Sequence, residues 1–369
     1  MTQPLRLLIL GPLGPPHVSD QALALSERGV DVRVGGNSLP GLDDTVLEGA
    51  GIPVSTAPAG ARSTPLGMAS TVRWARRLIA EVTPDVINAH WLPGFGFAAA
   101  AAGASPLALT AWGSDVYRAS ARMRLANRYA VRRAELLLAD SSDLLARAAG
   151  FASKEVRAEV VQWGVDLRTF APSPGGTSEA KRRLGLGPGP VVLSPRSFMP
   201  VYNIPTIVTA FKRIGEAMPD AQLVLKHMGP VSIELPELPH PERVRLVGNV
   251  AYEEMVEYYR AADVCLSITS SDSSPRSVWE AMACGCPCVL SDLPWVGELI
   301  GPASAALTVP VDDSAVADAA LRVLTHPDLA AGLAERGRAL VERTLNRELE
   351  MDRLAELLSN LSSRPRDAP

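Results

Sequence analysis

Two acidic residues, Asp272 and Glu280, are separated by seven residues around a predicted helix start. Ser274 is a plausible N-cap, and Pro275 suits the first helical position. The backbone N–H groups of residues 276–278 would then lack intrahelical partners, and such a helix start attracts phosphate through these donors and the helix dipole. Carboxylates can accept hydrogen bonds from neighbouring hydroxyls of a ribose or a hexose. The spacing therefore suits recognition of a sugar that is linked to a diphosphate.

The same residues allow a simpler interpretation. Arg276 and Glu280 are four residues apart on the predicted helix and could form a surface ion pair, in the weaker of its two orientations. Because helix N-caps are common, the local sequence leaves both interpretations open.

The elements that would position these acids follow from the pattern of apolar residues. Residues 263–269 (DVCLSIT) predict a strand buried on both faces, and SSDSS is a turn signal. SVWEAMAC continues the helix, Gly285 is placed to end it, and Pro287 prevents its continuation. A second strand begins at CVL. The segment is therefore predicted to be a strand–helix–strand unit.

The segment from Asp272 to Glu280, followed by AMACGCPCV and by Glu298, resembles the E-x7-E segment of the retaining, nucleotide-sugar-dependent glycosyltransferases of the GT-B fold (glycosyltransferase family 4). The resemblance implies that Glu280 holds the donor ribose and that Asp272 contacts the donor sugar. Asp272 stands where the family has Glu, which is one methylene longer. The resemblance covers nearly the whole chain and is most specific in the C-terminal half.

The chain has 369 residues, enough for two domains, and 47% of them are hydrophobic. The net charge of −4 does not favour a nucleic-acid binder. The N-terminal sequence lacks the features of a signal peptide, and no apolar run reaches the roughly 18 residues of a membrane-spanning helix. We therefore expect a cytoplasmic protein, with a peripheral contact at the inner face of the membrane as an open option.

The four cysteines are Cys265, Cys284, Cys286 and Cys288. Three of them form a C-x-C-x-C pattern, which matches no common zinc site. We interpret them as small apolar residues of the core. We expect no metal site and no cofactor other than the nucleoside diphosphate sugar, which would be a co-substrate.

Alternating strands and helices predict an α/β fold with parallel sheets. Gly11 and Gly14 follow the first strand with the spacing G-x-x-G, so the dinucleotide fingerprint is absent and a nicotinamide or flavin cofactor is disfavoured. With the resemblance, the prediction becomes a GT-B fold of two doubly wound, Rossmann-like domains that face each other across a cleft. The expected parts are an acceptor-side domain (1–170), a linker (171–188), a donor-binding domain (189–345) and a helix that returns to the first domain (346–362).

Candidate acceptor residues lie where strands of the N-terminal half are predicted to end, because ligands bind off the carboxyl ends of parallel strands. NAHWLPGFG and TAWGSDVY each follow such a strand. Many family members carry His where this chain has Trp112, so His90 is the remaining candidate for a catalytic contact to the donor sugar. Packing alone is an almost equal alternative for His90. The acceptor-side candidates are Gly14, His17, His90, Trp91, Trp112, Ser114 and Asp115.

Candidate donor residues lie in the C-terminal half. The resemblance implies that Arg196 binds the donor diphosphate, but Tyr202 occupies the position of a second cation in the family. Lys226 could supply that charge, and the resemblance places the nucleobase near the loop at 248–250. The catalytic candidates are thus Arg196, Asp272, Glu280 and His90, and the donor-binding candidates are Arg196, Lys226, Asn249, Val250, Asp272, Ser273, Ser274, Pro275, Arg276, Ser277 and Glu280.

A predicted helix at residues 118–133 carries six arginines and no acidic residue. Arg73, Arg76 and Arg77 form a second basic run. A solvated helix face would explain both runs. The alternative is an anionic surface, either a phosphorylated acceptor or an anionic lipid.

These observations predict a retaining, metal-independent glycosyltransferase that moves a sugar from a UDP- or GDP-linked donor to a hydroxyl on a small-molecule, glycan or lipid-linked acceptor. Two alternatives stay open. One is a sugar-nucleotide epimerase or phosphorylase of the same fold, and the other is a non-catalytic two-domain binder of nucleotide sugars. Release of nucleoside diphosphate only in the presence of an acceptor would distinguish a transferase from both.

Overall fold

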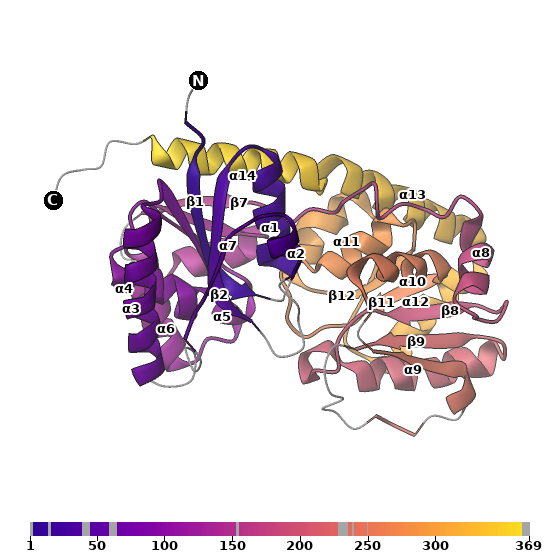
Figure 1. The fold of residues 1–369 in the computed structure, drawn as a ribbon. Helices are drawn as coiled ribbons and strands as arrows, with labels where there is room; N and C mark the ends of the chain where they lie inside the picture. The colour runs from indigo at the N-terminus through magenta and orange to yellow at the C-terminus, as the bar shows by residue number, and fades with distance from the viewer. Residues whose placement is uncertain are drawn as a thin grey trace. The chain divides into compact units, whose positions relative to one another are not determined.

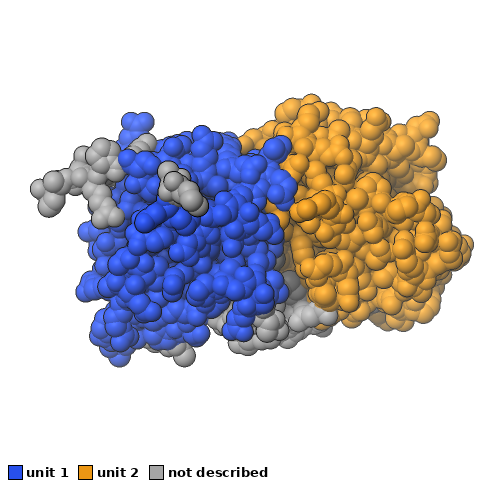
Figure 2. All heavy atoms as spheres, turned by 45° about the horizontal axis from the view of Figure 1, so that its top comes forward, with its two compact units in different colours: residues 1–163, 348–369 blue, residues 164–347 orange. Residues whose placement is uncertain are grey.

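The structure, a computed structural model, describes residues 3–13, 16–38, 45–58, 65–152, 155–227, 235–237, 240–248 and 250–363. The chain forms two compact units. Unit 1 comprises residues 1–163 and 348–369, and unit 2 comprises residues 164–347 (Figure 2). Each unit is built on one parallel β-sheet with helices packed against it (Figure 1). Among the described residues, no helix is long and apolar enough to cross a membrane.

The sheet of unit 1 has the strand order β3-β2-β1-β4-β5-β6-β7, with all neighbouring strands parallel. The strands are β1 (Arg6–Leu13), β2 (Asp31–Ser38), β3 (Val54–Thr56), β4 (Val86–His90), β5 (Leu107–Thr110), β6 (Leu136–Ala139) and β7 (Arg157–Val160). Because β1 pairs with β2 on one side and β4 on the other, the order of the strands reverses there. Ligands of doubly wound sheets bind beyond the carboxyl ends of the strands at this switch point.

Helices cover both faces of this sheet because successive side chains of a strand point to opposite sides. Leu7 and Ile9 of β1 pack in one cluster with α1 (Pro16–Glu27), α2 (Thr45–Gly49) and α14 (Arg347–Ser362). Leu8 and Leu10 pack in the opposite cluster with α3 (Pro65–Val82), η1 (Trp91–Gly96), α4 (Phe97–Ala102), α5 (Ser114–Tyr117), α6 (Ala121–Val131) and α7 (Ser142–Ala149). This is the two-sided burial that an uninterrupted apolar strand predicts.

The sheet of unit 2 has the strand order β10-β9-β8-β11-β12-β13, again parallel throughout. Its strands are β8 (Val191–Ser194), β9 (Gln222–Lys226), β10 (Val244–Val247), β11 (Val264–Ser267), β12 (Cys288–Ser291) and β13 (Leu307–Val309). One face packs against α9 (Ile204–Ala217) and α12 (Asp313–Thr325), and the other against α10 (Met255–Ala261), α11 (Arg276–Ala283) and α13 (Pro327–Thr344). β8 lies between β9 and β11, so the switch point of unit 2 is at β8.

The four cysteines are free thiols and lie in the buried cluster on the α11 side of the sheet. Burial raises the pKa of Cys284 to about 12. Gly285 follows α11 with φ of 78°, the left-handed conformation that commonly ends a helix.

The structure corrects the predicted linker and the predicted basic helix. Residues 171–188 include a helix, α8 (Gly176–Arg183), whose buried Lys181 forms an ion pair with Asp263 at 2.7 Å, and the two units divide between residues 163 and 164. The Pro, Ser and Gly content of this segment suggested a linker, but these residues only precede a short amphipathic helix. The basic helix begins at residue 121, because the Ser120 hydroxyl accepts a hydrogen bond from the backbone N–H of Met123.

Candidate functional site

The predicted donor residues converge on the carboxyl ends of four strands in unit 2. Arg196 lies two residues after β8, Lys226 is the last residue of β9, and Asp272 lies in the loop after β11. Val250, in the segment after β10, packs against the cluster on the α11 side. Asn249, like Gly14 of unit 1, lies outside the described residues. The fold therefore brings these separate segments to the switch point where a ligand is expected.

Arg196 connects the end of β8 to the start of α11. Its Nη2 atom lies 2.5 Å from Oδ2 of Asp272, and Nη1 donates to the Ser277 hydroxyl at 3.0 Å. The Tyr202 ring lies under the guanidinium, 4.2 Å from Cζ to the ring centroid. Burial lowers the pKa of Arg196, but the charge of Asp272 and other groups outweighs it, so the pKa is raised overall. Arg196 is therefore a permanent cation, and its Nε atom has no hydrogen-bond partner among the described residues.

The start of α11 differs in detail from the prediction. Pro275 is the N-cap, and Arg276 is the first helical residue. Ser274 does not cap the helix, because its hydroxyl accepts a hydrogen bond from the indole N–H of Trp279 at 2.8 Å. The backbone N–H of Val278 donates to the carbonyl of Pro275 at 3.0 Å and is not available to a ligand. The backbone donors that a phosphate could approach are thus reduced to those of residues 276 and 277.

Glu280 lies one turn into α11 and is 4% exposed. The phenol of Tyr252 donates to Oε1 at 2.6 Å, and the phenol of Tyr259 donates to Oε2 at 2.9 Å. Arg276 lies 3.7 Å from the same carboxylate and donates to the Tyr252 hydroxyl at 2.5 Å. The ion pair that the sequence allowed on the surface is therefore formed inside the site. A carboxylate offers about four acceptor positions, so Glu280 can accept further hydrogen bonds from a ligand.

Tyr252 and Tyr259 were not predicted as site residues. They lie seven positions apart in AYEEMVEYYRAAD, at residues 251–263, and their spacing would place them on one face of a helix. That spacing was the only signal in the sequence, because both phenols reach Glu280 across more than 20 residues of chain.

Lys226 and Asn203 complete the site of unit 2. Lys226 is half-buried; burial lowers its pKa, and the charge of Glu280 acts in the opposite direction. Asn203 has φ of 44°, and its side-chain amide donates to the hydroxyl of Ser270 at 2.8 Å. This contact ties the loop after β8 to the loop after β11. Arg196 and Asp272, which lie in these loops, are thereby held near each other.

The acceptor-side candidates of unit 1 form an aromatic cluster at the carboxyl ends of β4 and β5. The ring of His17 lies 5.2 Å from that of Trp112 and 4.5 Å from that of Trp163, measured between ring centroids. The ring of His90 lies 5.9 Å from that of Trp112. Trp163, which also donates to Asp140 at 3.2 Å, was not predicted as part of this group.

His90 is fully buried and both of its ring nitrogens are engaged. Nδ1 accepts a hydrogen bond from the indole N–H of Trp112 at 3.1 Å, so the proton of the neutral ring resides on Nε2 and is donated to Gln21 at 2.9 Å. Burial lowers the pKa of His90 to about 3. This arrangement favours a packing role and does not support the predicted catalytic contact.

Asp115 is also buried inside unit 1, and its carboxylate is already hydrogen-bonded. Its carboxylate accepts hydrogen bonds from the backbone N–H groups of Leu92, at 2.9 Å, and Trp112, at 3.0 Å. Burial raises the pKa of Asp115 to about 6, although these backbone hydrogen bonds act to lower it. Asp115 therefore joins the loops after β4 and β5. Ser114, by contrast, is exposed, and Trp91 begins η1 with φ of 65°.

Two families match the chain, one in each unit. The family of glycosyl transferases group 1 matches residues 177–340, and the glycosyl transferase 4-like family matches residues 6–141. Each of these matches lies within one unit. These matches support the resemblance first seen around Asp272 and Glu280, while the roles of the two acids and the retaining mode stay predictions.

Similar proteins of known sequence include two bacterial glycosyltransferases. The chain is 25% identical, over 53% of its length and 55% of the relative's, to a GDP-mannose-dependent monoacylated alpha-(1-6)-phosphatidylinositol monomannoside mannosyltransferase of Corynebacterium glutamicum. It is 29% identical, over 70% of its length and 66% of the relative's, to a D-inositol 3-phosphate glycosyltransferase of Kribbella flavida. The chain thus spans about half to two thirds of the length of these relatives.

Among solved structures, the sucrose-phosphate synthase of Thermosynechococcus elongatus superposes with a TM-score of 0.79 and 21% identity, over 97% of this chain and 99% of that one. This likeness concerns the fold. Together with the two parallel sheets, it confirms the predicted α/β fold of two Rossmann-like domains of the GT-B type.

Proposed function

We propose that the chain is a retaining glycosyltransferase that moves a sugar from a UDP- or GDP-linked donor to a hydroxyl acceptor. The observation that carries this proposal is the cluster at the switch point of unit 2. A buried arginine, two acids and a helix start lie together there, with Arg196 against Asp272 and Ser277 and with Glu280 one turn further on. The family matches of both units support the reaction class, and the GDP-mannose-dependent relative supports a nucleoside diphosphate sugar as the donor.

Each part of the cluster has a chemical role in this proposal. Arg196 and the first backbone N–H groups of α11 bind the diphosphate, because a guanidinium and a helix start are both suited to phosphate oxygens. Glu280, oriented by the two phenols, accepts hydrogen bonds from the ribose hydroxyls. Asp272 accepts a hydrogen bond from the donor sugar. Lys226 adds positive charge that the Tyr202 position lacks.

The stereochemical part of the proposal follows from the placement of acids and bases. An inverting transfer needs a general base on the acceptor side, opposite the leaving group. His90 and Asp115 are buried and already hydrogen-bonded, so neither is set up for that role. In a retaining transfer, the departing phosphate oxygen can take the proton of the acceptor hydroxyl. The protein then has to stabilise the negative charge that develops on the phosphate, and Arg196 is placed to do so. No metal ion is needed in this scheme.

The test separates binding from transfer. We expect Glu280→Ala to weaken nucleoside diphosphate binding by about 1–3 kcal/mol, because charged hydrogen bonds to the ribose are lost. Calorimetry on the folded variant measures this, with Glu216→Ala, an exposed residue of α9, as a matched control. Unchanged affinity in Glu280→Ala would refute the assignment.

The reaction itself is tested by nucleoside diphosphate release and by the product. Release that depends on an acceptor supports a transferase over an epimerase, a phosphorylase or a binder. A proton NMR spectrum of the product should show an α-linkage from an α-configured donor. The opposite anomeric configuration would contradict the retaining mode.

A further inference from the structure

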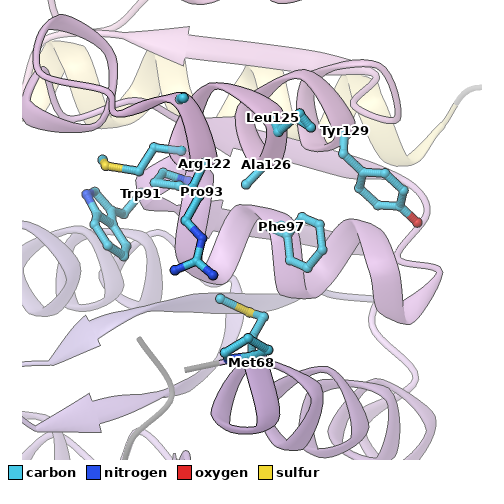
Figure 3. Close-up of a pocket in the computed structure, with 11 residues that line it drawn as sticks. Met68, Trp91, Pro93, Phe97, Arg122, Leu125, Ala126 and Tyr129 are labelled. Atoms are coloured by element: carbon cyan, nitrogen blue, oxygen red, sulfur yellow. The ribbon is translucent and has the colours of Figure 1, made fainter. Parts of the chain in front are cut away.

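An apolar pocket of about 760 Å³ lies in unit 1, and none of its lining residues is among those assigned above to the donor (Figure 3). It is formed by the start of α3, by η1 with α4, and by α6. Most of its lining is hydrocarbon or aromatic ring, including Met68, Phe97, Leu125 and Tyr129. Its volume lies within the range of about 300–1,000 Å³ that is typical of small-molecule sites.

Among the described residues that line the pocket, Arg122 is the one cation. Figure 3 shows its side chain extending from α6 between Trp91 and Phe97 toward the Met68 side of the pocket. The Arg122 side chain forms no ion pair with a carboxylate among the described residues, and α6 itself carries no acidic residue. An apolar cavity with a guanidinium in its lining is suited to a molecule that has both a hydrocarbon part and an anionic group.

The helices that form the pocket are rich in arginine, although the whole chain has a net charge of −4. Eight further arginines of α3 and of the segment 118–133 are exposed, and none of them pairs with a carboxylate in the described parts of the chain. Three of them line a second hollow of about 280 Å³. These eight arginines are Arg73, Arg76, Arg77, Arg118, Arg124, Arg128, Arg132 and Arg133.

Two large apolar side chains of the same elements face solvent. Leu125 on α6 is 64% exposed, and Leu66 at the start of α3 is 84% exposed. Basic side chains beside exposed apolar ones are typical of helices that bind at an anionic membrane surface. A water-soluble phosphate would use the arginines but would leave the pocket and these leucines without a role. The combination therefore favours a lipid.

We propose that the pocket binds an acyl chain of an anionic membrane lipid, with Arg122 paired to the lipid's acidic head group. The inference rests on the proposed function and deepens it, because it assigns the acceptor to the class of anionic lipids. The remaining arginines attract the anionic membrane surface, and the pocket binds the acyl chain of one lipid molecule. The positive charge of the arginines alone would bring the protein to the membrane. Insertion of an acyl chain into the pocket would select a single lipid as the acceptor.

The experiment uses vesicles of phosphatidylcholine, alone or mixed with phosphatidylglycerol, whose acyl chains are brominated so that they quench tryptophan at close contact. We expect the intact chain to sediment with the anionic vesicles only. Part of its fluorescence should be quenched, and Trp91→Phe should remove that part, because Trp91 lines the pocket. Equal recovery in the supernatant with both vesicle types, or quenching that is unaffected by Trp91→Phe, would overturn the proposal.

Three further variants distinguish binding in the pocket from general electrostatic attraction to the membrane. Arg122→Ala and Arg132→Ala each remove one exposed cation, but only Arg122 lines the pocket. We expect about fivefold weaker vesicle binding for Arg132→Ala, and at least tenfold for Arg122→Ala. Ala126→Phe fills the pocket without changing the charge and should abolish the quenching while the protein still sediments. Equal effects of the two arginine variants, or full quenching in Ala126→Phe, would contradict the proposal that the pocket binds one acyl chain.

The outcomes also distinguish this inference from the proposed function. If nucleoside diphosphate binds to unit 2 and vesicles do not bind, the lipid site is wrong and the proposed function is unaffected. If vesicles bind with quenching and no nucleotide binds, the lipid site stands and the proposed function fails. A dimer that dissociates in Leu125→Ser would show that a second copy covers the pocket, and would overturn the lipid assignment.

Discussion

Acidification should destabilise unit 1 through His90. The ring is fully buried, Nδ1 accepts a hydrogen bond from Trp112, and the proton on Nε2 is donated to Gln21. A second proton would have to be placed on Nδ1, directly opposite the indole N–H that donates to it. The charged ring would also lie in a site without access to water. Both effects oppose protonation of the folded protein.

The size and sign of the effect follow from the pKa. Burial lowers the pKa of folded His90 to about 3, while an unfolded histidine titrates near 6.5. Between these values the unfolded chain binds more protons, so the stability is full above pH 6.5 and is lost as the pH falls toward 3. One pKa unit corresponds to about 1.4 kcal/mol, so the difference between the two pKa values corresponds to about 5 kcal/mol of the free energy of unfolding. About 3 kcal/mol of this is lost by pH 4.

The assay compares the intact chain with His90→Gln at pH 7 and pH 4. Hydrogen exchange on peptides from β4 and β5, corrected for the intrinsic rate at each pH, reports the free energy of opening of unit 1. The variant should be less stable than the natural chain at pH 7, but it should lose about 3 kcal/mol less between pH 7 and pH 4. His240→Gln, which alters an exposed histidine of unit 2, is the control and should match the natural chain.

Asp115 has the opposite pH dependence and is unchanged in both proteins. Its pKa is raised to about 6, so it stabilises the folded state below its ordinary pKa and loses that contribution as the pH rises through 6. This contribution cancels in the comparison. If the natural chain and His90→Gln lose equal stability on acidification, the buried neutral His90 described above is wrong.

Four further predictions concern other parts of the chain. Arg196→Lys keeps the charge but cannot hold Asp272 and Ser277 together, so calorimetry should show roughly tenfold weaker nucleoside diphosphate binding, and unchanged affinity would contradict its role. Turnover should be complete in excess chelator, and activity that disappears and returns with Mg²⁺ would contradict the proposed phosphate site. Leu358→Ala, fully buried on α14, should cost unit 1 about 2–5 kcal/mol in urea unfolding, and a loss below 1 kcal/mol would show that α14 is loosely packed. Gly285→Ala should cost unit 2 roughly 1–2 kcal/mol through its φ of 78°, and an unchanged urea midpoint would argue against that strain.

The local elements of this fold could be predicted because they depend on short-range patterns. The strand predicted at residues 263–269, which is β11, and the end of α11 at Gly285 follow from apolar runs and turn residues. The start of α11 was placed one residue early, because Ser274 had a competing partner in Trp279 that the sequence does not reveal.

The sequence proposes residues for the candidate site, but it does not predict the contacts between them. Arg196 and Asp272 lie 76 residues apart and were assigned separate ligands, yet they touch each other in the folded chain. His90 was predicted to reach the donor sugar because it follows a strand, but its partner Gln21 comes from a helix 69 residues away and holds the ring inside. The apolar pocket is formed by four elements, and no single motif in the sequence predicts that they meet.

The discontinuity of unit 1 has a consequence for its synthesis on the ribosome. Residues 1–163 are made before unit 2, but the apolar face of Leu7 and Ile9 also needs α14, which follows unit 2 in the sequence. At about 5–20 residues per second, the intervening chain takes roughly 10–40 s to emerge. During that time unit 2 can fold by itself, while this face of unit 1 lacks part of its cover. The nascent chain should therefore bind chaperones through its N-terminal segment until α14 has been made, and a chain that stops before residue 347 should aggregate.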